Sequence, residues 1–132
     1  MPERPPYSCT VPAVAPSLNE WKRWHWTKQE KARKDFQWML WCLLLEKGNQ
    51  CPKGLERVVI TAAITLTTNR RRDGDNFGAL LAKWSQDTIV KLGVIPDDDH
   101  TRCKFMLPPT ILVGSIEQTF LVIREDVRRD GR

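Results

Sequence analysis

The sequence predicts a single small α+β domain, with a four-stranded mixed sheet and two main helices in the order β-α-β-α-β-β. The length of 132 residues suits one domain with its own core. Two stretches carry apolar side chains at helical spacing, and β-branched stretches lie before, between and after them. We expect the domain to span residues 1–132, with a proline-rich N-terminal segment at 1–16 and a charged tail at 125–132.

The N-terminal part combines prolines with a basic and aromatic segment. Residues 7–14 suit a short edge strand, because proline is tolerated at sheet edges. Pro16 to Glu20 has the composition of a turn or loop. Residues 21–26 then alternate tryptophans with bases, a pattern that suits stacking on nucleotide bases and phosphate binding. Buried tryptophans flanked by solvated cations would explain the same pattern.

The first long helix is predicted from Thr27-Lys28-Gln29-Glu30, which forms a capping box. It is expected to end near Gly48, a residue suited to a C-terminal cap. Its apolar residues recur at helical spacing and predict one buried face: Ala32, Phe36, Met39, Leu40, Leu43 and Leu44.

The second half of the chain supplies the remaining strands and the other helix. Residues 58–67 are β-branched and partly alternating, which predicts a strand. Apolar spacing predicts a helix from Asn76 to Leu92, ending at Gly93. Two later apolar stretches, 103–107 and 115–123, are expected to pair with one another. The sequence predicts that they are joined through Pro108, Pro109 and Gly114.

Two acidic groups flank the second helix. Asp73 and Asp75 follow three arginines, and Asp97-Asp98-Asp99 comes after the helix. Carboxylates that crowd together repel one another unless a cation lies between them, and oxygen ligands suit magnesium or manganese. Adjacent guanidinium groups suit phosphate. The combination indicates phosphodiester chemistry, although an acid here could equally cap the helix.

The distance between these acidic groups limits how they can meet. A straight helix over residues 76–92 would be about 25 Å long. The five residues after Gly93, up to Asp98, can run back along the helix for roughly 16 Å when the chain is extended. A helix that starts later or bends would bring the groups together. So would a loop running back beside the sheet, or assembly across a dimer.

These motifs together resemble the RusA family of Holliday-junction resolvases, which is common in phages and prophages. The resemblance covers most of the chain. It rests on the Pro-Ser-x-Asn turn at 16–19, the basic-aromatic segment through Trp26 and the motif Arg72-Asp73-Gly74-Asp75-Asn76 after the central strand. It also includes Gly93-Val94-Ile95-Pro96-Asp97-Asp98 after the second helix.

The resemblance implies a magnesium-dependent homodimeric endonuclease that makes paired symmetric nicks in four-way DNA junctions. Manganese would be a possible substitute for magnesium. The metal-binding and catalytic carboxylates would be Asp73, Asp75 and Asp98. The assisting lysine would be Lys83, because Ala79 occupies the position four residues after Asp75 where the family has lysine. Lys83 lies one helical turn further along.

Further side chains are expected to contact DNA. The net charge of +5 favours a polyanionic partner. The arginines suit backbone phosphates, and Asn19 and His25 suit positioning of the strand. The complete predicted set is Asn19, Lys22, Arg23, His25, Lys28, Arg70, Arg71 and Arg72.

The spacing of the cysteines and the hydropathy of the chain indicate the cellular compartment in which the protein is expected. The four cysteines have no zinc-binding spacing, and reduced thiols are expected: Cys9, Cys42, Cys51 and Cys103. No apolar run is long enough to span a bilayer, and no signal-peptide core is present, so no membrane partner is expected. We therefore expect a cytoplasmic protein, which for this family means the bacterial host cell and its nucleoid DNA.

Other functions explain part of the pattern. An EF-hand is excluded, because the fifth and twelfth positions counted from Asp73 are Phe77 and Trp84. An aspartyl phosphatase would have its acidic motif directly after a strand, without three intervening arginines. A protein that binds branched DNA without cutting it remains an alternative, as does a less selective flap or branch nuclease. A solvated acidic loop beside a capped helix is the simplest structural explanation.

Overall fold

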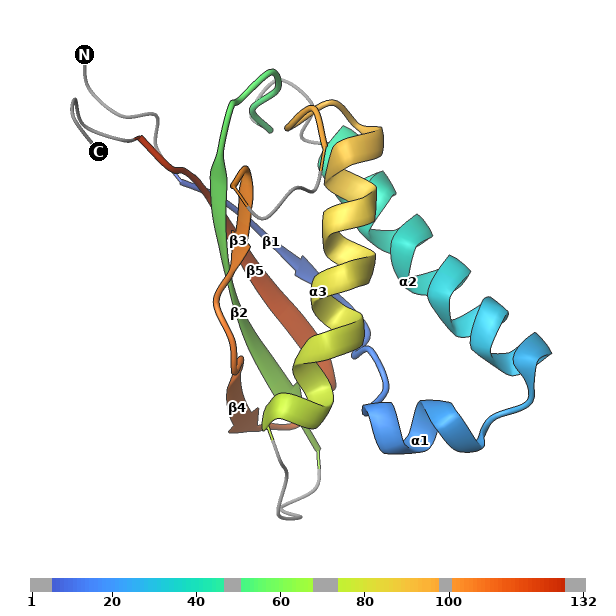
Figure 1. Cartoon of the computed structure of the whole chain (residues 1–132). Coiled ribbons are helices and arrows are strands. Elements are labelled where there is room, and N and C mark those ends of the chain that lie inside the picture. Colours follow the sequence, from blue (N-terminus) through green and yellow to red (C-terminus); the bar gives the residue numbers. More distant parts are fainter. Residues whose placement is uncertain (1–5, 47–50, 68–73, 98–100, 128–132) are drawn as a thin grey trace.

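A five-stranded sheet carries helices on one of its faces (Figure 1). The computed structural model describes residues 6–46, 51–67, 74–97 and 101–127. The elements in chain order are β1 (Tyr7–Val11), α1 (Leu18–Arg23), α2 (Trp26–Glu46), β2 (Val58–Leu66), α3 (Gly74–Lys91), β3 (Cys103–Phe105), β4 (Thr110–Val113) and β5 (Gln118–Glu125). The α+β class predicted from the sequence is confirmed, and the sheet has one strand more than predicted.

Strand β2 is the centre of the sheet. It pairs antiparallel with β5 on one side and parallel with β3 and β4 on the other, and β1 pairs antiparallel with β5. The predicted pairing of the last two strands is wrong, because β2 lies between β3 and β5. Residues 110–113, expected to be part of the connection, form a strand that follows β3 along the same edge of β2.

Two helix starts also differ from the sequence prediction. The segment expected to be a loop contains the beginning of α1, since Ser17 Oγ accepts a hydrogen bond of 3.2 Å from the Glu20 amide. Ser17 and Glu20 have the spacing of a capping box, and Ser17 Oγ donates in turn to Glu20 Oε1 at 3.2 Å. Helix α2 begins one residue before Thr27, whose amide donates to His25 Nδ1 at 3.2 Å.

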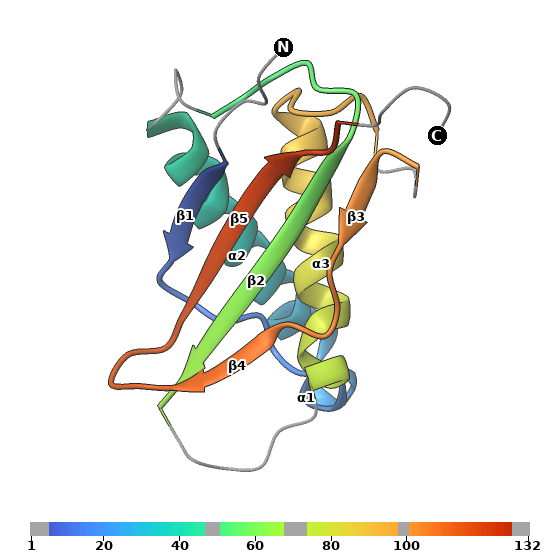
Figure 2. The ribbon, with the colours of Figure 1, turned by 90° about the vertical axis from the view of Figure 1, so that its left-hand side faces the viewer.

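The core lies between the helices and one face of the sheet. Side chains of β2 alternate strictly between buried and half-buried, and Val58, Ile60 and Ile64 are at most 1% exposed. Leu40 of α2 and Leu81 of α3 are fully buried against this face. None of the helices in the described part of the chain lies over the other face (Figure 2).

Helix α3 runs back along β2, so its two ends lie at opposite ends of that strand (Figure 1). Its last turn is closed by Gly93, which has a φ of +82°. The Gly54 amide donates to the Gly93 carbonyl at 2.8 Å, and the Leu55 amide donates to the Val94 carbonyl at 2.8 Å. These bonds fix the C-terminal end of α3 beside the start of β2.

Candidate functional site

Helix α1 and the first turns of α3 lie at the same end of the molecule (Figure 1). The contact is aromatic: the rings of Trp21 and Trp84 meet edge to face, with centroids 5.4 Å apart. Trp84 is only 2% exposed and also packs on Phe36 of α2, at 5.8 Å between centroids. Gln29 Nε2 donates to the Trp21 carbonyl at 2.7 Å. Trp84 therefore joins all three helices and holds α1 in place.

The basic and aromatic segment divides into a packed part and an exposed part. Trp21 packs against the core, whereas Trp26 is 66% exposed and lies near the His25 ring, at 5.8 Å between centroids. Lys28 Nζ lies 4.2 Å from the centre of the Trp24 ring, a cation–π contact. The buried-tryptophan explanation therefore holds for Trp21, and base stacking by the exposed Trp26 stays a prediction.

The predicted DNA contacts in this segment all lie on the surface. The exposed side chains are those of Asn19, Lys22, Arg23, His25 and Lys28. Arg70, Arg71 and Arg72 lie outside the described residues. Helix α1 carries exposed Lys22 and Arg23 in its last turn and lies at the same end of the molecule as the start of α3, and exposed cations of this kind suit phosphate (Figure 1).

The acidic residues expected to bind metal are only partly described. Asp75 is in the first turn of α3, while Asp73, Asp98 and the side chain of Asp75 lie outside the described residues. Within the described part of the chain, no three His, Cys, Asp or Glu side chains are grouped so that they could hold a metal ion. The metal-binding assignment of Asp73, Asp75 and Asp98 stays a prediction.

The two acidic groups lie beside different ends of α3. Asp97 is exposed just beyond the C-terminal end of the helix, with its Oδ1 3.9 Å from Arg102 Nε. Asp75 is at the other end, and an 18-residue helix is about 27 Å long. The helix begins at Gly74, two residues before the predicted start, so a later start does not shorten this separation.

Lys83, the predicted catalytic lysine, lies on α3 between these two ends. Its side chain is 71% exposed, and its Nζ is 3.9 Å from Asp87 Oδ2. The position is about 12 Å along the helix from Asp75. The Asp87 partner lies one helical turn further toward the C-terminal end, on the side away from Asp75.

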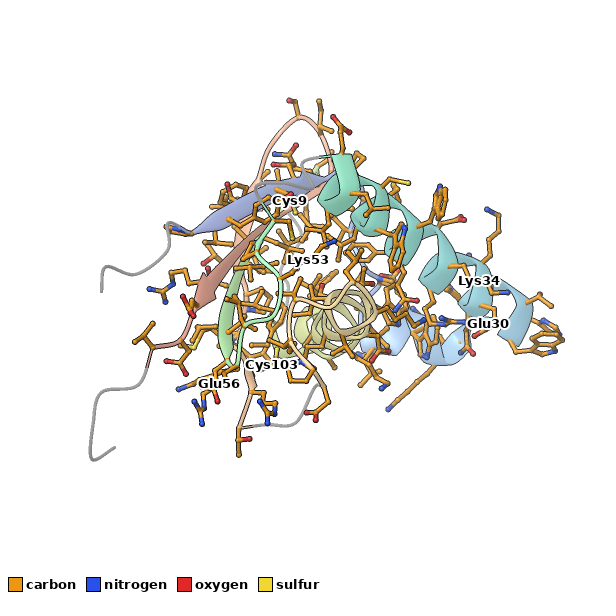
Figure 3. All side chains as sticks on the ribbon, turned by 90° about the horizontal axis from the view of Figure 1, so that it is seen from above. Cys9, Glu30, Lys34, Lys53, Glu56 and Cys103 are labelled. Atoms are coloured by element: carbon orange, nitrogen blue, oxygen red, sulfur yellow. The ribbon has the colours of Figure 1, made fainter. Side chains whose placement is uncertain are left out.

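Most of the thiols are buried in the described structure. Three are buried and one, Cys42, is exposed. Figure 3 shows Cys9 and Cys103 on separate strands, and burial raises the pKa of the Cys51 thiol. A raised pKa disfavours the thiolate form of Cys51.

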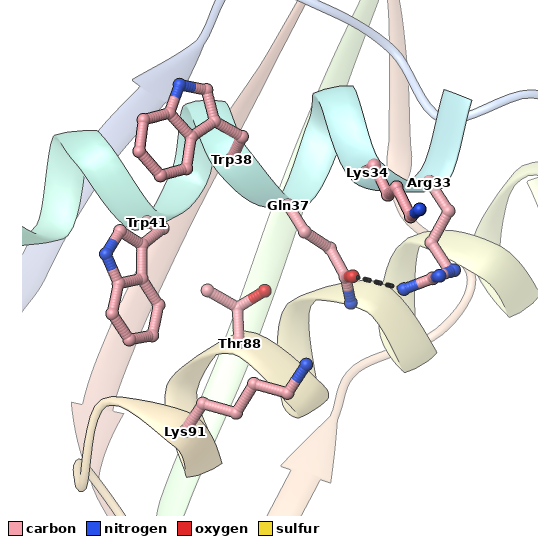
Figure 4. Close-up of a pocket in the computed structure, with 7 residues that line it drawn as sticks. All are labelled: Arg33, Lys34, Gln37, Trp38, Trp41, Thr88 and Lys91. Atoms are coloured by element: carbon pink, nitrogen blue, oxygen red, sulfur yellow. Dashed lines mark hydrogen bonds between the residues drawn. The ribbon is translucent and has the colours of Figure 1, made fainter. Parts of the chain in front are cut away.

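A second candidate site was missed by the sequence predictions. A groove of about 490 Å³ runs between α2 and α3 (Figure 4). It is lined by two tryptophans, three cationic side chains and two neutral polar ones: Trp38, Trp41, Arg33, Lys34, Lys91, Gln37 and Thr88. The sequence signal was the position of Trp38 and Trp41 outside the predicted buried face of α2.

No protein-family model matches the chain, and no curated protein matches it either. None of the described helices is both long and apolar enough to cross a bilayer.

Proposed function

We propose that this protein is a magnesium-dependent endonuclease that resolves four-way DNA junctions by paired symmetric nicks, acting as a homodimer. The observation that carries the proposal is the layout of α3. One end of this helix lies at the same end of the molecule as α1 and carries Asp75, and the other end leads to the second acidic group. DNA phosphates repel carboxylates, so acids beside a DNA-binding surface suggest a bound cation.

A two-fold dimer offers a way to bring the acidic groups together. A two-fold axis perpendicular to α3 places the N-terminal end of one copy of the helix beside the C-terminal end of the other. Helix α3 is close to the edge formed by β3 and β4, since a Cβ added at Gly78 would be 3.3 Å from Pro109 Cδ. Contact along this edge would form two equivalent sites, each with Asp73 and Asp75 from one copy and Asp98 from its partner.

The side chains have separate roles in this proposal. Asp73, Asp75 and Asp98 hold Mg²⁺, or Mn²⁺ as a substitute. A magnesium ion bound there supplies a more acidic water and stabilises the departing 3′ oxygen. Lys83 neutralises charge at the scissile phosphate. Lys22, Arg23 and the arginines at 70–72 hold backbone phosphates on either side, in a cytoplasmic protein acting on its host's DNA.

A second function is favoured by the separation along α3. If each chain works alone, the two acidic groups stay about a helix length apart and form no shared metal site. The protein would then bind branched DNA through its cations without cutting it. A less selective flap or branch nuclease would share the catalytic residues and differ only in substrate.

A junction-cleavage assay tests the proposal. Purified protein is incubated with a labelled synthetic four-way junction or a matched linear duplex, in magnesium or in EDTA. We expect paired nicks in the junction only, and only with magnesium. The Asp75→Asn variant should cleave at least about 100-fold more slowly. Substituting a residue that only supports a metal ligand already lowers metal affinity or activity 10–100-fold, and a direct ligand should matter more. Its junction affinity should be equal or higher, since one repulsive charge is removed.

Mixing two inactive variants tests whether the site is shared between copies. Asp75→Asn and Asp98→Asn subunits are unfolded together and refolded. In a shared arrangement each mixed dimer keeps one complete site and nicks one strand, whereas sites within single chains give no activity. Either variant refolded alone is the control. Tight junction binding without cleavage in magnesium or manganese would instead establish the binding-only function.

A further inference from the structure

We propose that the groove between α2 and α3 binds unpaired nucleotides of a DNA or RNA strand, with the bases stacked on Trp38 and Trp41 and the phosphates held by Lys34 and Lys91. This site is separate from the residues assigned to catalysis. It requires no metal ion and no dimer, so it goes beyond the proposed nuclease function.

The strands of the sheet lie behind the two helices that line the groove (Figure 4). Lys34, Trp38 and Trp41 come from α2, and Thr88 and Lys91 come from α3. The volume of about 490 Å³ is in the range of small-ligand pockets. Both helices are anchored in the core by fully buried leucine and isoleucine side chains, so the two sides of the groove are held at a fixed separation.

Hydrogen bonds fix the polar floor of the groove before any ligand arrives. Gln37 Oε1 accepts from Arg33 Nη1 at 2.9 Å, and Gln37 Nε2 donates to the Trp84 carbonyl at 3.2 Å. The Thr88 hydroxyl donates to the same carbonyl at 2.9 Å. Arg33 is held in turn by Glu30, at 2.8 Å between Nη2 and Oε2. A ligand that binds here spends little free energy on ordering the protein.

The tryptophans offer stacking surface that the fold leaves in water. The side chain of Trp38 is 65% exposed, the second most exposed tryptophan among the described residues after Trp26. Trp41 lies three positions later on α2 and is half-buried in the groove. Residues three apart on a helix are neighbours on its surface, and both indoles line the same groove. Stacking on such an area tolerates any base, because every base has a π face.

The charge of the groove selects an anion. Arg33 is paired with Glu30, and the hydrogen bond from Arg33 lowers the pKa of Glu30. Asp87, the nearest acid on α3, lies 3.9 Å from Lys83. Lys34 and Lys91 have no ion pair with any residue that the structure describes. Two cations without an ion pair, one from each helix, therefore line the groove together with the indoles.

An unpaired strand matches both features at once. Single-stranded nucleic acid alternates flat bases with phosphates, and proteins that bind it combine aromatic side chains with a cationic groove. Duplex DNA hides its base faces and would use the lysines alone. An acidic protein segment would use the lysines and pack aliphatic side chains on the indoles, and the experiment below distinguishes it.

The test measures binding of a fluorescent twelve-nucleotide dT strand by anisotropy in EDTA, so that cleavage plays no part. Trp38→Ala should bind about 5- to 100-fold more weakly, as expected for the loss of one stacked base. Trp38→Phe should recover most of the affinity, because it keeps a flat ring. Lys91→Gln should reduce the slope of log affinity against log salt by about 0.7. Both positions, 38 and 91, are exposed, so all three variants should fold.

Two controls decide the outcome. Lys53→Gln removes an exposed lysine outside the groove and should leave affinity and salt slope almost unchanged; Figure 3 shows Lys53 away from Lys34. A glutamate-rich peptide of equal charge should bind more weakly than the strand. The proposal is overturned if Trp38→Ala and Lys91→Gln bind dT like the wild type. It is also overturned if the peptide binds as tightly as the strand with the same response to the variants. A failed junction-cleavage assay leaves this result untouched.

Discussion

Trp84 should be the most costly aromatic residue to remove. It is 2% exposed and contacts the rings of Trp21 and Phe36, so it joins α3 to both other helices. A buried tryptophan removes 150–250 Å² from water, which corresponds to about 4–6 kcal/mol at 25 cal/mol per Å². Truncations of this kind cost 3–5 kcal/mol in practice. We expect Trp84→Ala to lower the free energy of unfolding by about 4 kcal/mol.

Urea unfolding followed by far-ultraviolet circular dichroism measures this loss without depending on tryptophan fluorescence. With a slope of roughly 1.5 kcal/mol per M, the midpoint should fall by between 2 and 3 M. Gln37 and Thr88 donate hydrogen bonds to the Trp84 carbonyl, which remains after the substitution. The loss of free energy of unfolding therefore measures the contribution of the indole ring. Trp38→Ala, which removes an exposed indole, should stay within about 0.5 kcal/mol of the wild type. A loss below about 1 kcal/mol for Trp84→Ala would refute the reasoning.

Two further substitutions test local features of the fold. Gly93→Ala should cost about 1 kcal/mol in urea unfolding, because φ is +82° and no atom lies within 4 Å of the added methyl group; an unchanged midpoint contradicts this. Burial raises the pKa of Tyr7 from 10.0 to about 12. The folded state therefore holds the phenol proton more tightly, and the free energy of unfolding should fall between pH 10 and 12 but not below pH 10. Tyr7→Phe should lack this decline, and an equal decline in both proteins would assign it to other groups.

The sequence was most informative where a single pattern determines a single outcome. The alternation over residues 58–66 and the apolar spacing of Phe36, Leu40 and Leu44 predicted a strand and a buried helix face, and both are confirmed. The partner of each strand could not be obtained in this way. Residues 103–105 pair with β2 instead of β5, and this choice depends on where the chain enters the sheet after α3. Alternation within a strand carries no information about its neighbour.

The candidate site was predictable as a set of residue types but not as an arrangement. The sequence placed the acidic groups on either side of a helix and gave its length, and the structure retains that separation. It could not indicate that α1 lies at the N-terminal end of α3, because that position depends on the contact of Trp21 with Trp84 across 63 residues of chain. Contacts between residues far apart in sequence leave no local pattern.

The angular position of residues around the axis of α2 predicts one side of the α2–α3 groove. At 100° per residue, Trp38 lies about 200° around the helix from Phe36, so it cannot share the buried face that Phe36 defines. The core of the protein does not explain this tryptophan, because other residues of α2 already form the buried face. The lysine at position 34, one helical turn away, favours a ligand that is anionic and has a flat surface. The angular positions of residues on α2 do not predict the side of the groove that α3 forms. Only the packing of α3 against α2 brings Lys91 to the same groove, and the two-helix origin of the cations is what distinguishes a binding site from a solvated helix surface.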